Sequence, residues 1–490
     1  MFRICAALLL AACALPAQAQ QAQRNCAVCG SFYPETPSQL NAATAEFYKK
    51  ASAAKKPDGK VLALLAPHAG YYFSGQTAAW AYAAAGDAYD TVVIIGTGHN
   101  DRLDRAALDN SVYKTPAGDV QPDLAVISGL LKNGELFELN PSAHKPEHSI
   151  EVQLPLLMAR LKRPFALVPV LLNASGLDNA VLVGKNIAAA LRGRKALIVI
   201  SSDLSHYPPA DIARASDLTI IEAVKTLDPS YLALTAKELE SSKAKNLEVA
   251  ACGLQALIAG ISAATALGAN EADLLQYTNA GELPGFPPDK AVGYAAMAFV
   301  KAAKPQKKDW PLSPEQQRFL LREARRSIAD AFAGIPLSPA PLSMSPELNL
   351  PAALFVTITE NGRLRGCVGT TEPLGSALDS ARYFARSAAF SDTRFTPLKE
   401  PELDRVTLEI SLLSRPEAVS SPSSIIPGRH GVIVQRAGRK GVFLPQVWKQ
   451  VPSKEKFLNE LCEQKAGMER DCWKSGNTKL YIFTDYAFSE

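Results

Sequence analysis

The chain has 490 residues, a length that predicts two to four domains, each large enough to bury its own core. Hydrophobic residues make up 47% of the chain and charged residues 20%, which excludes a disordered, collagen-like or coiled-coil protein. The net charge of +4 comes from 52 Lys and Arg against 48 Asp and Glu, and it gives no argument for a nucleic-acid partner.

Residues 1–19 have the pattern of an export signal. Arg3 supplies the positive start, the apolar run 4–15 is too short to span a bilayer, and Ala17-Gln18-Ala19 is a typical cleavage site. We therefore expect an exported, periplasmic protein that begins at Gln20. An alternative is a lipoprotein, because the segment that ends at Cys13 resembles a bacterial lipobox. No later run of 18 apolar residues predicts a transmembrane segment.

Cys26 and Cys29 form a C-x-x-C pair close to the expected mature N-terminus. In an oxidising compartment this spacing favours a small disulfide or a redox-labile pair. Haem attachment requires a His after the second Cys, and that position is Gly30. A zinc site would need a second pair of ligands nearby, and the sequence offers none.

The first domain, expected over residues 20–304, alternates short apolar runs with Ala-rich segments. The runs 61–66, 91–95, 165–172, 196–200 and 292–300 are typical of strands that are buried on both faces. Helical patterns fall between them, at 75–84 and 177–191. This alternation predicts an α/β domain with a mostly parallel sheet flanked by helices.

A polar, Pro-punctuated segment at 301–314 predicts a linker to a second domain over residues 313–490. Ser313, Pro314 and Gln316 then have the pattern of a helix start with a capping box. The remaining elements predict an α+β domain. Strands are expected at 353–359, 364–368, 407–413, 432–435 and 442–444, with a hairpin turn at Asn361-Gly362, and helices at 374–390 and 455–464.

Three of the six histidines follow predicted strands within a few residues. His68, His99 and His206 come just after the strands at 61–66, 91–95 and 196–200. Ligands gather where the carboxyl ends of parallel strands meet, so a shared site is a better interpretation than three unrelated polar loops. Imidazole is the commonest transition-metal ligand, and catalytic metal sites often add an anionic group. The anionic candidates are Asp203, Glu147, Glu151 and Cys252.

Several segments over about residues 26–302 resemble the Memo family, protein B of the AmmeMemoRadiSam system. They are Gly30-Ser31-Phe32-Tyr33-Pro34, Ala66-Pro67-His68-Ala69-Gly70-Tyr71, Gly98-His99-Asn100, Glu147-His148-Ser149-Ile150-Glu151, Ser201-Ser202-Asp203-Leu204-Ser205-His206 and Ala251-Cys252-Gly253. The resemblance implies a fold similar to that of class III extradiol dioxygenases. The residues that depart from the family pattern, such as Gly96-Thr97 before His99, bear on the shape of the pocket and on the substrate.

The Memo resemblance also implies the site. The family's metal ligands, two His and one Cys, correspond to His68, His99 and Cys252, and His206 with Asp203 would be the catalytic groups beside the metal. A thiolate ligand favours iron or copper, with zinc possible, over magnesium or calcium. Asp203 or Glu147 could instead orient an imidazole.

The second domain resembles the AMMECR family, protein A of the same system. The resemblance lies in Leu364-Arg365-Gly366-Cys367-Val368-Gly369, Ser391-Asp392-Thr393-Arg394-Phe395 and Gly441-Val442-Phe443-Leu444-Pro445. It implies joint action with a radical-SAM enzyme on an unknown peptide or small-molecule substrate. Two functions fit: a metal-dependent redox or oxygenase-type enzyme, or a non-catalytic metal-binding or scaffold protein. Cys367 is either a thiol with a lowered pKa or a packed structural residue.

Overall fold

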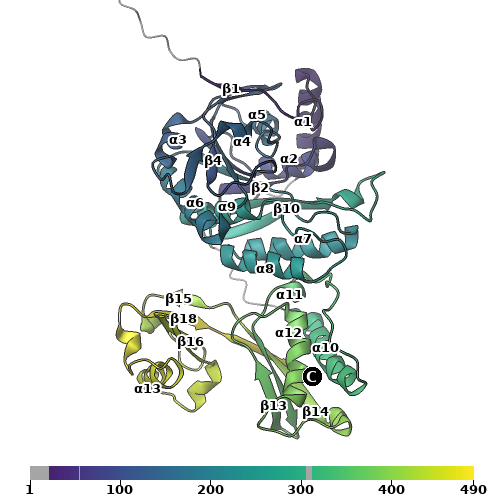
Figure 1. The fold of residues 1–490 in the computed structure, drawn as a ribbon, viewed down its shortest axis with the longest axis vertical. Helices are drawn as coiled ribbons and strands as arrows, with labels where there is room; N and C mark the ends of the chain where they lie inside the picture. The colour runs from purple at the N-terminus through teal and green to yellow at the C-terminus, as the bar shows by residue number, and fades with distance from the viewer. Residues whose placement is uncertain (1–20, 54–55, 305–311) are drawn as a thin grey trace, which may run out of the picture.

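A computed structural model of the protein describes residues 21–53, 56–304 and 312–490 (Figure 1). The expected export signal at 1–19 and the lipidation alternative at Cys13 lie outside the described residues, as do residues 305–311 of the expected linker. The cleavage site and the domain boundaries therefore stay predictions.

The first part of the chain is built on an eight-stranded sheet. Its centre consists of four parallel strands in the spatial order β2 (Lys60–Ala66), β9 (Ala196–Ser201), β3 (Thr91–Thr97) and β8 (Ala166–Leu172). β11 (Gly293–Lys301) joins β2 in antiparallel orientation and pairs in turn with β10 (Glu271–Asn279). At the other edge β4 (Ala106–Leu108) is antiparallel to β8 and parallel to β7 (Phe137–Leu139). The sheet is thus parallel at its centre, with antiparallel strands on its flanks.

Helices cover both faces of this sheet, as the apolar runs predicted (Figure 1). In β2, Ala63 and Leu65 pack into one core and Leu64 and Ala66 into the other, because successive strand residues point to opposite faces. The first core lies against α3 (Leu124–Leu130), α6 (Gly176–Ala190), α7 (Ala210–Lys225), α8 (Pro229–Ser241) and α9 (Leu254–Ala266). The second lies against α1 (Pro37–Ala51), α2 (Gln76–Ala83) and α5 (Gln153–Arg160).

Smaller elements complete this part of the chain. A three-stranded sheet contains β1 (Gln23–Arg24), β5 (Val112–Thr115) and β6 (Gly118–Val120). One turn of α-helix, α4 (Pro141–His144), precedes α5. Helices α6 and α9 approach closely at Gly184, where a Cβ atom would lie 2.1 Å from the carbonyl oxygen of Ala259. A larger residue at this position would force the two helices apart.

The second part of the chain has two four-stranded antiparallel sheets. In the first, the strand order is β13 (Arg363–Gly369), β12 (Leu354–Glu360), β14 (Val406–Leu413) and β19 (Asp485–Ser489), and α10 (Pro314–Phe332) and α12 (Ala377–Phe390) supply its core. In the second, the order is β15 (Glu417–Val419), β18 (Lys479–Phe483), β16 (Gly431–Arg436) and β17 (Arg439–Phe443), with α13 (Lys454–Glu460) in its core.

Local signals in the second part are confirmed. α10 begins at a complete capping box in which Ser313 and Gln316 bond reciprocally. Asn361 and Gly362 turn the β12–β13 hairpin with φ of 51° and 74°, the left-handed region that this turn requires. The helix expected over 374–390 begins later, at Ala377, because Ser376 caps it through the backbone N–H of Asp379.

The two parts contact each other through α8 and the segment that carries the short α11 (Pro346–Asn349) (Figure 1). The Tyr231 hydroxyl donates to the carbonyl oxygen of Pro351 at 2.8 Å, and Arg415 lies 3.4 Å from Asp228. A cavity of about 450 Å³ is lined by residues of both parts, among them Leu239 and Tyr383. None of the helices in the described ranges is long and apolar enough to cross a membrane.

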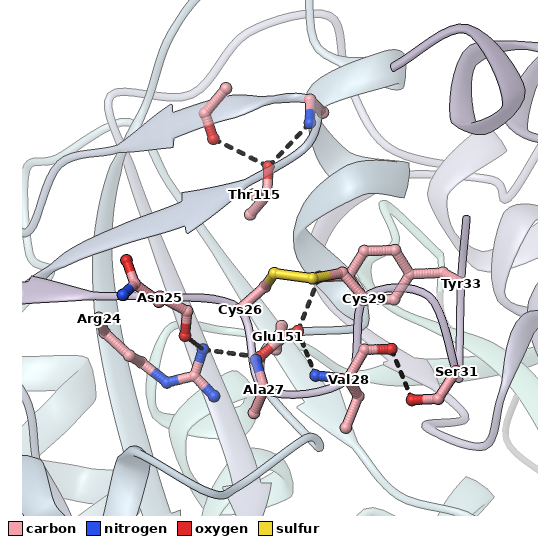
Figure 2. Close-up of a disulfide and its surroundings, with 12 residues drawn as sticks. Arg24, Asn25, Cys26, Ala27, Val28, Cys29, Ser31, Tyr33, Thr115 and Glu151 are labelled. Carbon is pink, nitrogen blue, oxygen red and sulfur yellow. Dashed lines mark hydrogen bonds and ion pairs between the residues drawn. A yellow bond between two sulfur atoms is a disulfide. The ribbon is translucent and has the colours of Figure 1, made fainter. Parts of the chain in front are cut away.

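Two disulfides join cysteines within the described residues. Cys26 is joined to Cys29, as the C-x-x-C spacing indicated (Figure 2). Cys462 is joined to Cys472 inside the core around α13, a pairing that the sequence did not predict because its spacing has no local signature.

Candidate metal centre

The residues expected to form a site follow three neighbouring parallel strands. His68 comes two residues after β2, His99 two residues after β3, and Asp203 two residues after β9, the strand between them. Parallel strands end at the same edge of a sheet, so the register brings these loops together. The rings of His68 and His99 lie 5.1 Å apart and nearly perpendicular.

Glu147 orients His99 and fixes its tautomer. Glu147 Oε1 lies 2.9 Å from His99 Nδ1, and Oε2 accepts the backbone N–H of His99 at 2.7 Å. A carboxylate is an acceptor only, so Nδ1 carries a proton, and the neutral form of the ring has its free lone pair on Nε2. Burial works to raise the pKa of Glu147, but its hydrogen bonds with His99 outweigh that effect and hold the pKa well below its usual value.

His68 is fixed by a second network, beneath the site. The Ser201 hydroxyl donates to the carbonyl oxygen of Ser149 at 2.6 Å and accepts from Gln153 Nε2 at 2.9 Å. Because the hydroxyl proton of Ser201 is already donated to Ser149, Ser201 Oγ accepts from His68 Nδ1 at 3.2 Å. The Nε2 atom of His68 is therefore left without a proton. This nitrogen is buried and has no hydrogen-bond partner among the described residues. Burial, with the neighbouring His99, lowers the pKa of His68 to about 3.

His148 also belongs to this cluster, and sequence reasoning did not select it. One ring nitrogen from each of His68, His99 and His148 can be chosen so that all three lie within 4.8 Å of one another. The ring of His148 stacks on that of His99 at 4.5 Å. Burial, followed by the charge of His68, lowers the pKa of His148 to about 4. The residue lies in the loop before α5, away from any strand end, and its position beside Glu147 in a quoted motif was the only signal.

Cys252 lies on the other side of His99, just before α9. Its Sγ is 3.4 Å from His99 Nε2, the atom that the tautomer leaves free. Burial, together with the charges of Asp203 and Glu147, raises the pKa of the Cys252 thiol to about 12. The structure brings Cys252 to His99, and the role of Cys252 as a ligand together with His68 stays a prediction.

Asp203 and His206 flank the cluster. Asp203 Oδ1 accepts the backbone N–H of His68 at 2.7 Å, and Oδ2 lies 3.9 Å from His68 Nε2. His206 pairs through its backbone with Val249 and Val292, and its Nε2 is buried without a hydrogen-bond partner in the part of the chain that is described. Burial raises the pKa of Asp203 and lowers that of His206. Their expected catalytic role is untested by this geometry.

Of the four anionic candidates, Glu151 is fully engaged elsewhere. Its carboxylate accepts from Arg24 and from the Tyr33 hydroxyl, both at 2.7 Å, and from the backbone N–H groups of Ala27 and Val28 (Figure 2). It therefore holds the N-terminal segment in place and has no lone pair to spare for the histidine cluster.

The donor set fits a transition metal ion. His68 and His99 each present an Nε2 lone pair, and burying an unpartnered nitrogen such as His68 Nε2 costs free energy unless something binds there. A cation would also offset the cost of ionising Cys252 between two carboxylates. The side chain of His99 is 29% exposed and that of His68 is 2% exposed, so solvent reaches the cluster at His99.

The comparisons with known proteins identify the family of the first domain. The sequence model of the family described as "Memo-like protein" matches residues 24–298. The chain belongs to this family. A MEMO1 family protein of Methanosarcina barkeri is 34% identical over 276 residues, which span 56% of this chain and 98% of that protein. A MEMO1 family protein of Nitrosopumilus maritimus is 30% identical over 285 residues, 56% of this chain and 99% of that protein.

The Memo-like domain is followed by a second family match. The AMMECR1 family model covers residues 321–488, so one chain carries both domains. A crystal structure of the uncharacterized protein PH0010 from Pyrococcus horikoshii is 35% identical and covers 36% of this chain and 93% of its own, with a TM-score of 0.33.

In the AMMECR domain, Cys367 is a free, partly buried thiol on β13. It accepts from the Thr357 hydroxyl at 3.4 Å, and its backbone N–H donates to Asp392 at 2.8 Å. Arg394 donates to its carbonyl oxygen at 3.1 Å. These contacts fit either of the two expected roles of Cys367.

Proposed function

We propose that the Memo-like domain binds a transition metal ion, iron or copper in preference to zinc, through His68, His99 and Cys252, with His148 as an additional ligand. The observation that carries this proposal is the buried Nε2 of His68, which has no hydrogen-bond partner within the described chain and belongs to a ring that lies 5.1 Å from that of His99. Two imidazoles with a thiolate form a soft donor set, which disfavours magnesium and calcium.

We further propose that the site is catalytic, with a redox or oxygenase-type activity on a small molecule or peptide. The partial exposure of His99 supports this, since catalytic metal sites keep an open position and structural ones are closed. When bound, the metal would supply redox chemistry at that open position.

The protein's own groups would hold the site and move the proton. Glu147 keeps the proton of His99 on Nδ1, and Ser201 does the same for His68. His206 Nε2 is buried and has no hydrogen bond to any described residue, so it would accept or return a proton of the substrate. Asp203 would hold the loop of His68 and favour the charged form of His206. A closed site that holds metal without turnover would instead support the metal-binding or scaffold alternative.

The wider assignment is also a proposal. We infer that the protein is exported, acts in the AmmeMemoRadiSam system with a radical-SAM enzyme, and uses its AMMECR domain to present the substrate. Two disulfides support an oxidising compartment, because such bonds are rare in the cytosol. Linkage in one chain supports joint action of the two domains, since it gives each a high effective concentration near the other.

Metal analysis of protein purified without added metal tests the proposal, followed by an oxygen-consumption screen. Iron or copper at about one ion per chain is expected. Cys252→Ser should lose most of the affinity, because a neutral hydroxyl replaces a thiolate, whereas Cys367→Ser is the matched control and should bind as the wild type does. Equal metal binding by the wild type, Cys252→Ser and Cys367→Ser would contradict the assignment of Cys252 as a ligand. Metal that remains only in Cys252→Ser would contradict it as well.

A further inference from the structure

We propose that Cys26 and Cys29 form a redox-active pair that exchanges thiol and disulfide with an external dithiol, and that this exchange controls how Phe32 packs on His148. The two cysteines are three residues apart and joined across a tight turn (Figure 2). Both are partly exposed, and their neighbours Asn25, Ala27 and Gly30 are exposed as well. A small dithiol or a thioredoxin-like protein can therefore reach the bond.

The second disulfide provides an internal contrast. Cys462 is 0% exposed and Cys472 is 2% exposed, and both pack in the core with Phe457 and Leu458. Reducing that bond requires the core to open, whereas reducing Cys26–Cys29 requires no unfolding. Exposed disulfides are the labile and regulatory ones, and buried ones resist reduction.

The turn has supports that do not depend on the disulfide. Glu151 accepts the backbone N–H groups of Ala27 and Val28 at 2.7 and 3.0 Å (Figure 2). The backbone N–H of Phe32 donates to the carbonyl oxygen of Val28 at 2.8 Å. These bonds keep the reduced turn attached to the fold, so the exchange is reversible in the folded protein even though the turn has lost its cross-link.

The same turn contacts the histidine cluster. The ring of Phe32 lies 4.9 Å from that of His148. The carbonyl oxygen of Phe32 also accepts the backbone N–H of Tyr71 at 2.7 Å, three residues after His68. Reduction removes the cross-link from a turn that braces two histidine-bearing segments, so His148 and His68 should both gain freedom.

In this exchange the external dithiol is the reductant and the Cys26–Cys29 disulfide is the oxidant. One thiolate of the dithiol attacks a sulfur of the Cys26–Cys29 bond, which breaks, and the other cysteine leaves as a thiolate. The second thiol of the reagent then attacks the mixed disulfide, closes the reagent into its own disulfide and releases the first cysteine. Two electrons and two protons pass from the dithiol to Cys26 and Cys29.

Labelling tests the redox pair without reference to metal. The folded protein is incubated with graded dithiothreitol, alkylated and mapped by mass spectrometry. We expect Cys26 and Cys29 to be labelled at dithiothreitol concentrations at least about tenfold below those needed to label Cys462 and Cys472, because the first disulfide is partly exposed and the second is buried. Labelling of both pairs at the same concentration, or of Cys26 and Cys29 only after unfolding, would overturn the proposal.

The second part of the proposal, that the redox state of Cys26 and Cys29 affects metal binding through His148, rests on the proposed metal site. Co²⁺ affinity is the measurement that tests it. Cys26→Ser/Cys29→Ser mimics the reduced turn without a reductant in the sample, and it should bind Co²⁺ about tenfold more weakly than the oxidised wild type, the scale of supporting contacts at metal sites. In a Phe32→Ala background the same double change should have no further effect. Unchanged affinity in the double variant, or an equal loss in both backgrounds, would refute the coupling. Absence of Co²⁺ binding in every form would refute the metal site and the coupling, whereas the labelling result would still decide the redox pair.

Discussion

Replacing Glu147 by Gln tests whether this carboxylate prepares the histidine cluster for metal. The change preserves size and removes one acceptor oxygen. Glu147 is buried, and it accepts from His99 Nδ1 and from the backbone N–H groups of His99, His148 and Ser149 at 2.7 to 2.9 Å. In the variant, either His99 Nδ1 or a backbone N–H must face an amide NH₂ group, which cannot accept.

The magnitude follows from these contacts. One buried N–H left unsatisfied costs about 1–3 kcal/mol of folding free energy. Loss of a group that supports a metal-binding His costs about 10–100-fold in affinity, or roughly 1.4–2.8 kcal/mol. The Glu147→Gln protein should therefore unfold at a lower urea concentration. It should also bind Co²⁺ more weakly, because a neutral amide raises the basicity of the His99 ring less than a carboxylate does.

Titration with Co²⁺ against a competing chelator measures the affinity, and urea denaturation measures stability. Glu138→Gln is the matched control, because Glu138 pairs with Arg105 at the surface, where an ion pair contributes about 0–1 kcal/mol. If Glu147→Gln binds Co²⁺ within twofold of the wild type while remaining folded, the charge of Glu147 does not support His99 as a ligand.

Replacing His206 by Ala should keep metal binding and abolish turnover, as metal analysis and oxygen consumption would show; lost metal would make His206 a ligand instead. Burial raises the pKa of Asp217 to about 7, so its proton stabilises the fold below about pH 4 and that contribution is lost as the pH rises to 7. Urea denaturation should show the stability of the wild type relative to Asp217→Asn falling by about 4 kcal/mol over that range, and a constant difference would contradict this assignment. Phe457 is 0% exposed and stacks on Trp448 at 3.6 Å, so Phe457→Ala should lower the free energy of unfolding by about 3–5 kcal/mol, and a loss below about 1 kcal/mol would show that the core collapses around the gap. Mass spectrometry of the mature protein should find Gln20 at the N-terminus. A diacylated Cys13 would contradict cleavage after Ala19 and support the lipoprotein alternative.

Features of this protein that depend on neighbouring residues could be predicted from its sequence. The continuous apolar run at β3 predicts a strand that is buried on both faces. Asn361-Gly362 predicts the turn of the β12–β13 hairpin. Each pattern acts through the local backbone. His68 and His99 were expected to meet for a similar reason. Each follows a buried strand of a parallel sheet, and in such sheets strand ends share one edge.

Tertiary structure alone decided which further groups join them. His148 comes from a loop with no strand before it, and only the packing of that loop over β3 and β2 places its ring on His99. The free nitrogen of His68 likewise depends on Ser201, which lies 133 residues further along the chain, and on the contacts of Ser201 with the segment of Ser149 and Gln153. Contacts between distant segments leave no periodic or spaced pattern in the sequence, because the folded backbone, and not local spacing, sets the distances between them.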